Sequence, residues 1–345
     1  MKTTLNAMGI RAAGMVTGVG LTAPATCAAI RCAIDQFSST RFLDKQGEWI
    51  VGSPVKLEKS WHGITKLARM TVAAIRECLM EAGALNPADI PLILCVAEQD
   101  RPGRIADLES RLFEDIQSEL GARFHPLSDV ISAGRVSGAR ALQQARMMIH
   151  EEQIPYVLIA GVDSFLSGTT LQAFEAQNRL LTTENSNGFI PGEAAAAILV
   201  GAPDAQELVC LGIGEGQEKA TIMSEEPLRA DGLVEAFQAA VRESGCDWNA
   251  LDYRLVDCNG EEYKFREASL ALYRLLRVNK NDLEIWHPAD CIGEIGAAIV
   301  PCLVGMALQA QRKGYAPGRG ALAHVGNDSG ERYAFILAAQ GGITG

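Results

Sequence analysis

The sequence of 345 residues lacks an excess of positive charge and lacks a long apolar run. Its 31 Lys and Arg stand against 42 Asp and Glu, which gives a net charge of −11. An acidic chain of this kind does not indicate binding to nucleic acid or to an anionic membrane. The longest nearly apolar run, residues 296–308, is shorter than the roughly 18 residues that a transmembrane helix needs. We therefore expect neither a nucleic-acid partner nor a membrane span.

Paired cysteines and clustered histidines are also missing. The 9 cysteines are scattered, none forms a Cys-x-x-Cys pair, and the 5 histidines show no spacing typical of a zinc site. We therefore predict no metal site. An odd number of scattered cysteines is typical of reduced thiols, and this favours a cytoplasmic protein.

What the sequence does contain is an alternation of short apolar runs with segments in which apolar residues recur every three or four positions. This alternation is typical of an α/β protein. Strands are predicted over residues 12–19, 92–97, 156–160, 194–200, 208–213, 253–257, 320–324 and 332–338. Helices are predicted over residues 64–82, 105–120, 137–150, 232–244, 263–276 and 295–312.

Two segments, residues 126–139 and 285–298, share one pattern: a strand, a glycine-containing turn and a helix that begins with small residues. This similarity indicates an internal duplication with a join near residues 201–207. Small residues at these positions would also serve merely to pack a helix on a sheet. We predict an N-terminal half, residues 1–205, and a C-terminal half, residues 206–345.

Residues 188–195, Gly-Phe-Ile-Pro-Gly-Glu-Ala-Ala, resemble the G-F-x-P-G-E-G-A signature of β-ketoacyl synthases, which have the thiolase fold. Five further parts of the chain resemble motifs of that family, and they occur in the family's order. They are residues 11–24 (similar to T-G-x-G-x-x-T-P), 131–139 with 156–163, 253–260, 296–298 and 326–330.

This resemblance implies a thiolase-like α/β fold, with two duplicated halves in five layers, α-β-α-β-α. It also implies a protein that uses no cofactor and forms a homodimer, or a heterodimer with a catalytic paralogue. The signature residues are expected to support the structure. They are Gly188, Phe189, Pro191, Gly192 and Glu193.

Family members condense acyl groups with a cysteine thiolate at a helix N-terminus and two histidines that stabilise the developing oxyanion. In the matching register, the cysteine position is Arg135 and the histidine positions are Asn259 and Gly293. A guanidinium stays protonated and is not a nucleophile. A shift of one residue restores neither a cysteine at the turn before the first helix nor a histidine before the second. The resemblance therefore implies a member that lacks the Cys-His-His residues.

A buried cation at a helix N-terminus needs an anionic partner. We expect Arg135 to pair with Glu294, or with Glu261 or Glu262, and to fill the former acyl pocket. The alternative is that its side chain points into solvent. The residues expected to surround this pocket are Arg135, Asn259, Glu261, Glu262, Glu294 and Asn327.

The function that this combination favours is that of a non-catalytic partner or adaptor. It would act beside a catalytic paralogue, as chain length factors do, or as an accessory factor in a type VI secretion gene cluster. Two alternatives stay open. The chain could transfer or condense acyl groups from carrier-protein or CoA thioesters, with Cys258 or a nearby glutamate recruited for new chemistry. It could also bind an acyl chain or a lipid without reacting with it.

Overall fold

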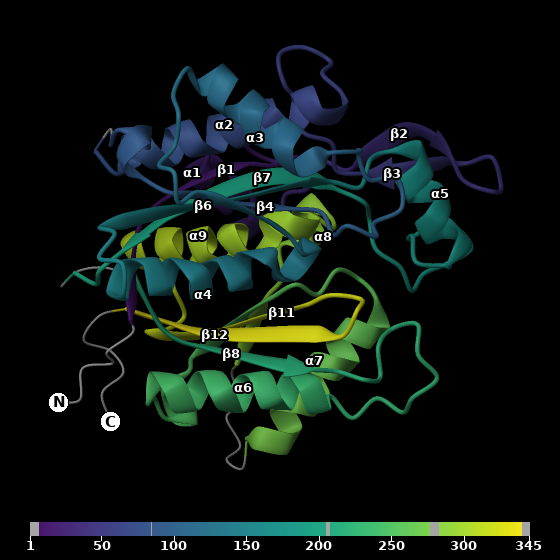
Figure 1. Cartoon of the computed structure of the whole chain (residues 1–345). Coiled ribbons are helices and arrows are strands. Elements are labelled where there is room, and N and C mark those ends of the chain that lie inside the picture. The colour runs from purple at the N-terminus through teal and green to yellow at the C-terminus, as the bar shows by residue number, and fades with distance from the viewer. Residues whose placement is uncertain (1–6, 84, 205–207, 277–282, 340–345) are drawn as a thin grey trace.

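The computed structural model describes residues 7–83, 85–204, 208–276 and 283–339. Its elements form five layers, with helices outside, the two five-stranded parts of one ten-stranded sheet between them, and helices in the centre (Figure 1). Helices α2 and α3 cover one side, α4 and α9 lie in the centre, and α6 and α7 cover the other side. The helices are α1 (Ala23–Arg31), α2 (Gly63–Glu81), α3 (Leu108–Leu120), α4 (Ser137–His150), α5 (Gly168–Ala176), α6 (Asp231–Ser244), α7 (Glu262–Leu275), α8 (Ala289–Ile292) and α9 (Ile299–Arg312). The expected five-layer α/β arrangement is present.

The strands repeat one topology in the two halves. Counted along each half, they lie in the order 3-2-4-5-1, as β5-β4-β6-β7-β1 in the first and β10-β9-β11-β12-β8 in the second. In both halves the pairs 1–5 and 5–4 are antiparallel and the others parallel. These strands are β1 (Met8–Val16), β4 (Leu92–Val96), β5 (Asp129–Ser132), β6 (Tyr156–Ser164), β7 (Glu193–Gly201), β8 (Leu208–Gln217), β9 (Tyr253–Val256), β10 (Glu284–Trp286), β11 (Gly320–Gly326) and β12 (Glu331–Ala339). The repeated order is what an internal duplication produces.

The two halves are joined at one corner, where β1 pairs with β8 through Met8–Ile10. The predicted boundary between residues 205 and 206, within the join near residues 201–207, lies outside the described residues. The division of the chain into 1–205 and 206–345 therefore stays a prediction.

The predicted strands and helices are all present, with ends that differ by a few residues. The strand predicted over residues 12–19 ends at Val16, because Thr17 and Gly20 close a turn with a backbone hydrogen bond of 2.7 Å. Elements that the sequence patterns did not predict are α1, α5, α8 and the hairpin of β2 (Ser38–Leu43) and β3 (Trp49–Gly52). Helix α1 begins at an N-cap, where Thr22 Oγ1 accepts from the backbone of Ala25, and it has no long apolar stripe for a periodicity to reveal.

Small residues bring the two central helices together, as the sequence predicts. A side chain in place of Gly161 on β6 would collide with the backbone of Ala297, and one in place of Gly138 on α4 would lie 2.5 Å from Val300 Cβ. The turns that precede these helices, η2 (Gly134–Val136) and η4 (Gly296–Ala298), therefore pack against each other. This contact places residues from both halves around one point.

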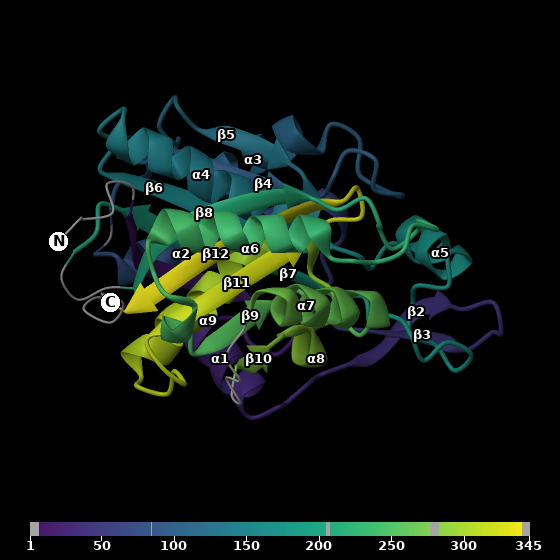
Figure 2. The same cartoon turned by 90° about the horizontal axis from the view of Figure 1, so that it is seen from below.

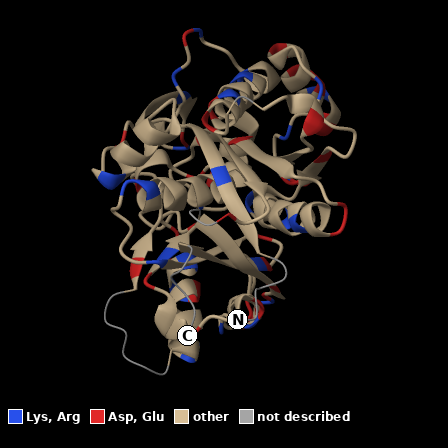
Figure 3. Ribbon diagram, turned by 90° about the vertical axis from the view of Figure 1, so that its left-hand side faces the viewer, with Lys and Arg blue, Asp and Glu red and all other residues tan. Residues whose placement is uncertain are grey.

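The structure shows how charge, thiols and apolar helices are distributed in the molecule. Acidic and basic residues are intermixed on the face drawn in Figure 3. All 9 cysteines are free, and only Cys32 is exposed. None of the helices in the described part of the chain combines the length and apolar character that crossing a membrane requires.

Candidate functional site

Arg135 lies in the turn η2, between β5 and α4, and only 4% of its surface is exposed. Its Nη1 lies 3.3 Å from Oε2 of Glu294, and its Nε donates to the carbonyl of Gly326 at 2.9 Å. Its Nη2 forms a short ion pair with Asp328. The expected pair between Arg135 and Glu294 is therefore present, and the alternative of a solvent-directed side chain is wrong.

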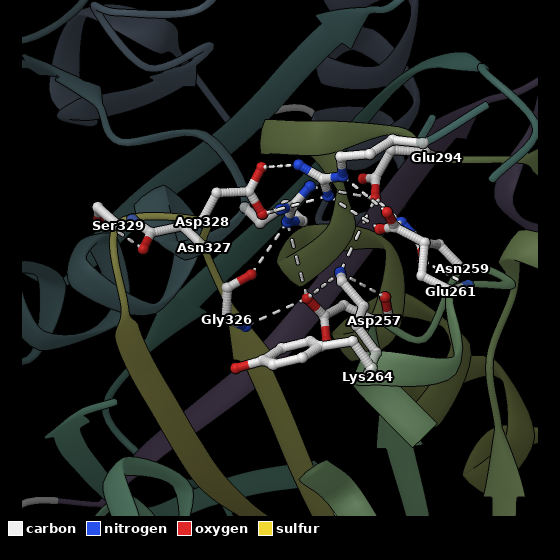
Figure 4. A network of polar contacts seen from close by, with 12 residues as sticks. Asp257, Asn259, Glu261, Lys264, Glu294, Gly326, Asn327, Asp328 and Ser329 are labelled. Carbon is white, nitrogen blue, oxygen red and sulfur yellow. Dashed lines mark hydrogen bonds and ion pairs between the residues drawn. The ribbon is translucent and has the colours of Figure 1, made fainter. Parts of the chain in front are cut away.

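A second arginine shares the Asp328 carboxylate. Arg179 Nη1 lies 2.6 Å from Asp328 Oδ2, and Arg179 Nε and Nη2 bind both oxygens of Glu261 at 2.7 and 2.9 Å. Figure 4 shows Asp328, Glu261 and Glu294 directed toward the same cluster of guanidinium groups. The expectation that Glu261 could pair with Arg135 is corrected: Glu261 forms a bidentate pair with Arg179 instead, which the fixed fork of an arginine favours.

Lys264 and Asp257 complete the cluster. Lys264 Nζ lies 2.9 Å from Asp257 Oδ2 and 3.8 Å from Glu294 Oε2. The amide of Asn259 donates to Glu294 at 2.6 Å and to Glu261 at 3.2 Å. We call the three cations and four carboxylates the ion network. Its members are Arg135, Arg179, Lys264, Asp257, Glu261, Glu294 and Asp328.

Two groups of the ion network, Arg135 and Asp257, are held in their charged forms in spite of their burial. Burial opposes the charge on Arg135, yet Asp328 and Glu294 outweigh it and raise the pKa of the guanidinium above its ordinary value. Burial likewise opposes the charge on Asp257, but Lys264 and Arg135 lower the pKa of that carboxyl below its ordinary value. Neighbouring ions of opposite sign thus favour the charged form of both groups.

Little free space remains beside the ion network. The cavity there measures about 20 Å³, which is room for roughly one water molecule. A larger cavity of about 530 Å³ lies near Phe42, Lys66 and Leu108, and Arg101 and Asp163 line it, whereas Arg135 does not. The side chain of Arg135 therefore does not stand at the end of this larger cavity.

Gly293, which the family resemblance aligns with the second histidine, has no room for a side chain. Gly293 has φ of +69°, and a Cβ built there would lie 2.6 Å from the carbonyl oxygen of Ile190. Both the backbone conformation and the contact favour glycine. The next turn begins at Gly296, whose N–H donates to Glu294 at 3.0 Å, and the N–H of Ala297 donates to Asp163 at 3.1 Å.

The signature segment holds Glu294 in place. The N–H of Gly192 donates to the carbonyl of Glu294 at 2.9 Å, and the N–H of Glu294 donates to the carbonyl of Ile190 at 2.8 Å. The carbonyl of Pro191 accepts from Ser53 at 2.9 Å. The segment thus pairs with the loop that carries Glu294, one of the partners of Arg135.

The other signature residues pack or bond within the N-terminal half. Phe189 is fully buried, with ring centroids 5.6 Å from Phe165 and 5.2 Å from Phe174. Glu193 accepts from the backbone of Val55 at 2.8 Å. At Gly188, an added Cβ would collide with the backbone of Leu180.

Three residues predicted around the pocket are not members of the ion network: Asn259, which donates to two of its carboxylates, and Glu262 and Asn327, whose side chains bind elsewhere. Glu262 has a side chain that is 67% exposed and lies 3.9 Å from Arg266, because it faces outward from the first turn of α7. Asn327 donates to Glu331 at 2.7 Å, because it belongs to the turn between β11 and β12, and its neighbours Gly326 and Asp328 are the residues that bind Arg135.

Cys258, the thiol adjacent to Asn259, is only 1% exposed. Burial and the neighbouring Asp257 raise the pKa of this thiol to about 12, so it is protonated at neutral pH. A protonated and covered thiol is a poor nucleophile. Among the described residues, no group of His, Cys, Asp and Glu side chains is arranged to hold a metal ion.

Sequence reasoning missed four members of the ion network: Asp257, Arg179, Lys264 and Asp328. Asp328 is adjacent to the predicted Asn327. Because aspartate is common in polar turns, the sequence alone does not distinguish its role in the ion network from a role in the turn. Arg179 and Lys264 show no spacing relative to Arg135 that would connect them. Only the packing of the two halves brings these charges together.

The chain is similar in structure to ketosynthases and chain length factors. A chain of the AntDE:AntF complex, described as a type II PKS acyl-carrier protein with its ketosynthase, matches with a TM-score of 0.79 and 15% identity over 97% of this chain and 99% of that one. A chain from the complex of the ketosynthase ApeO with its chain length factor ApeC from Xenorhabdus doucetiae matches with a TM-score of 0.76 and 14% identity over 98% and 99%.

A third structure, a beta-ketoacyl synthase from Burkholderia phymatum STM815, matches with a TM-score of 0.75 and 15% identity over 97% of this chain and 99% of that one. No protein-family model and no curated protein matches the sequence. At this level of identity the likeness is one of fold, and it extends over nearly the full length of both chains. The chain therefore has the thiolase-like fold that ketosynthases and chain length factors share.

Proposed function

We propose that this chain is a non-catalytic, ketosynthase-like subunit that acts by binding a protein partner. The observation that carries the proposal is the place of Arg135. In the family register it occupies the position of the nucleophilic cysteine, and it is buried and bound to Glu294 and Asp328. A condensing enzyme needs a thiolate at this point, with space for an acyl group beside it. Here a permanently charged guanidinium takes up that position.

The surrounding positions support the same proposal. Gly293 leaves no room for the second histidine, and the amide of Asn259 at the first histidine position is engaged by Glu294 and Glu261. Cys258, the nearest thiol in sequence, is covered and protonated. Among the groups that changed chemistry could recruit, Glu261 and Glu294 are held in ion pairs, and Glu262 faces outward from α7.

The partner that we propose is a catalytic ketosynthase. The similar structures include a ketosynthase with its chain length factor and a ketosynthase with an acyl-carrier protein, so proteins of this fold assemble with both kinds of partner. We propose a cytoplasmic heterodimer with a catalytic paralogue, which this comparison supports as far as the kind of partner is concerned, with a homodimer as the alternative. An accessory role in a secretion gene cluster would require a partner of another fold.

Intact-mass spectrometry tests the absence of catalysis. The protein is incubated with malonyl and long-chain acyl thioesters of CoA and of carrier protein, and a catalytic ketosynthase serves as the positive control. We expect no covalent adduct on this chain and no decarboxylation of the malonyl group. An adduct that maps to a cysteine, above all to Cys258 and absent from a Cys258→Ser variant, would contradict the proposal and show an enzyme.

Co-expression tests the partner. The tagged chain is produced together with a ketosynthase encoded beside it, and the eluate is examined by native mass spectrometry. We expect a one-to-one heterodimer. A homodimer of this chain alone, with no ketosynthase retained, would contradict the heterodimer. Retention of a secretion-system protein instead would favour the accessory role.

A second candidate function is the binding of an acyl chain or lipid. The cavity of about 530 Å³ favours it, because Phe42, Leu108 and Leu166 give it apolar walls and its size suits a small ligand. Organic extraction of the purified protein followed by mass spectrometry tests this candidate. We expect a bound amphiphile that a cavity-filling Leu166→Trp variant loses. Empty preparations that also fail to bind added fatty acids would exclude it.

A further inference from the structure

A separate cavity of about 430 Å³ lies at the far edge of the C-terminal half. Helix α1, strand β10 and helix α8 enclose it together with Met306 in the middle of α9 and with Tyr315 and Pro317, which follow that helix. Figure 2 shows α1, β10 and α8 next to one another. The volume falls within the range of small-molecule pockets, about 300–1,000 Å³. None of the residues in the ion network lines this cavity.

The walls of this cavity are aromatic and rich in sulfur. The rings of Trp286 and Tyr315 have centroids 6.2 Å apart and planes inclined by 33°. Cys27, Cys291 and Met306 line the same space, and all three are buried. Burial raises the pKa of the Cys27 thiol to about 12, so it is a neutral group. Polarisable sulfur and aromatic faces together favour a flat ring.

Charges of both signs also line the cavity, and they come from different elements. The guanidinium of Arg31 on α1 lies 4.4 Å from the centroid of the Tyr315 ring, and no residue in the described part of the chain forms an ion pair with it. Opposite charge comes from Glu284 on β10 and Asp290 on α8. Glu284 accepts from Trp286 Nε1 at 2.9 Å, and Asp290 Oδ1 lies 3.2 Å from His287 Nδ1.

We propose that this cavity binds a zwitterionic aromatic ligand of the amino-acid class. The ring packs against Trp286 and Tyr315, the carboxylate pairs with Arg31, and the ammonium pairs with Asp290 and Glu284. A ligand with an amine alone leaves Arg31 without a counter-ion. A ligand with an acid alone places its charge beside two carboxylates. A zwitterion satisfies both, and the inference does not depend on the proposed partner role.

Isothermal titration calorimetry with three probes of equal ring size tests the proposal. They are L-phenylalanine, phenethylamine, which lacks the carboxylate, and 3-phenylpropionate, which lacks the ammonium. We expect L-phenylalanine to bind and each single-charge analogue to bind up to about fivefold more weakly, because Arg31, Glu284 and Asp290 are exposed and an exposed charge pair contributes less than about 1 kcal/mol. Similar affinities for all three probes, or no binding of L-phenylalanine at millimolar concentration, would overturn the proposal.

Variants of the charged residues distinguish binding in the cavity from non-specific binding elsewhere on the protein. Arg31→Met should weaken the binding of L-phenylalanine up to about fivefold and leave the binding of phenethylamine unchanged. Asp290→Asn should weaken the binding of phenethylamine and should not weaken that of 3-phenylpropionate. The matched control is Arg41→Met, because the Arg41 guanidinium also lies over an aromatic ring, Phe42 at 5.2 Å, but lines another cavity. Unchanged L-phenylalanine binding in a folded Arg31→Met variant would place the ligand elsewhere and overturn the assignment.

Discussion

Arg135 of the N-terminal half and Glu294 of the C-terminal half lie 3.3 Å apart, measured from Nη1 to Oε2, where the turns η2 and η4 of the duplicated fold meet. Both side chains are buried, with 4% and 3% of their surfaces exposed. The pair therefore links the two halves in the buried centre of the fold.

Arg135 is expected to be important for stability. Replacing it by methionine keeps much of its volume but leaves Glu294, Asp257 and Asp328 without their shared cation. Breaking a buried ion pair on one side costs about 3–5 kcal/mol. Guanidinium denaturation followed by circular dichroism should show an Arg135→Met variant less stable by this amount.

The matched control for this variant is Arg266→Met, because Arg266 is 63% exposed and lies 3.9 Å from its partner Glu262. An exposed pair contributes less than about 1 kcal/mol. If the two variants lost equal stability, the ion network would not be what holds the two halves together.

Stability should fall in acid partly through Asp257. Its pKa in the folded state is below the ordinary value because Lys264 and Arg135 overcome the effect of burial. The unfolded chain therefore binds a proton before the folded chain does. The contribution of Asp257 to the free energy of unfolding is complete above about pH 5. It is lost as the pH falls through about 3.9, the pKa of an unfolded aspartate, toward the lower pKa of the folded state.

Denaturation curves between about pH 7 and pH 3 measure this effect. An Asp257→Asn variant should be less stable at neutral pH and should lose less stability in acid than the native chain. Asp115→Asn, an exposed change on α3, is the control and should follow the native chain. Parallel curves for the native chain and the Asp257→Asn variant would contradict the assignment.

His324 should cause a separate loss of stability at a less acidic pH. It is 4% exposed, and burial lowers its pKa to about 3, with Asp257 acting in the opposite direction. Since the unfolded histidine has a pKa of about 6.5, the stabilising contribution of neutral, buried His324 is fully present above this pH. Below it, the free energy of unfolding should decrease by as much as about 1.4 kcal/mol per pH unit toward pH 3.

A His324→Asn variant tests this by removing the pH dependence between about pH 6.5 and pH 5. The control is His62→Asn, because His62 is exposed at the start of α2. Retention of the full slope in His324→Asn would show that another group titrates in this range.

Gly293 should not accept a side chain. Gly293→Ala brings Cβ to 2.6 Å from the carbonyl oxygen of Ile190 and keeps φ at +69°. Gly121 has φ of +68° and ψ of +24°, with no atom within 4 Å of its Cβ position, so Gly121→Ala measures the ordinary cost of a left-handed backbone. Gly293 has ψ of −169°, a conformation that essentially only glycine adopts, so its backbone adds to the cost of the close contact. We expect Gly293→Ala to lose about 1–3 kcal/mol more than Gly121→Ala in denaturation experiments. Equal losses would mean that the loop can move to admit a histidine.

Several parts of this molecule follow from local sequence. The apolar periodicities of α2, α4 and α9 and the short apolar runs of β4 and β7 predict those elements, because burial of one face or both faces leaves a regular pattern. The similarity of residues 126–139 to residues 285–298 predicts the duplication that the strand order now displays. The register of the motifs that resemble the β-ketoacyl synthase family also predicts Arg135 at the position of that family's cysteine.

Other parts depend on tertiary structure. Helix α1 and the β2–β3 hairpin carry little periodicity and are held by contacts with distant segments. The choice of Glu294 for Arg135 and of Glu261 for Arg179 depends on distances that span both halves. The duplicated α/β scaffold and the lack of a thiol in the turn before α4 can be read from the amino-acid sequence, because both are local patterns. The pairing of the buried charges depends on the three-dimensional packing, because a buried ion pair joins residues that no periodicity connects.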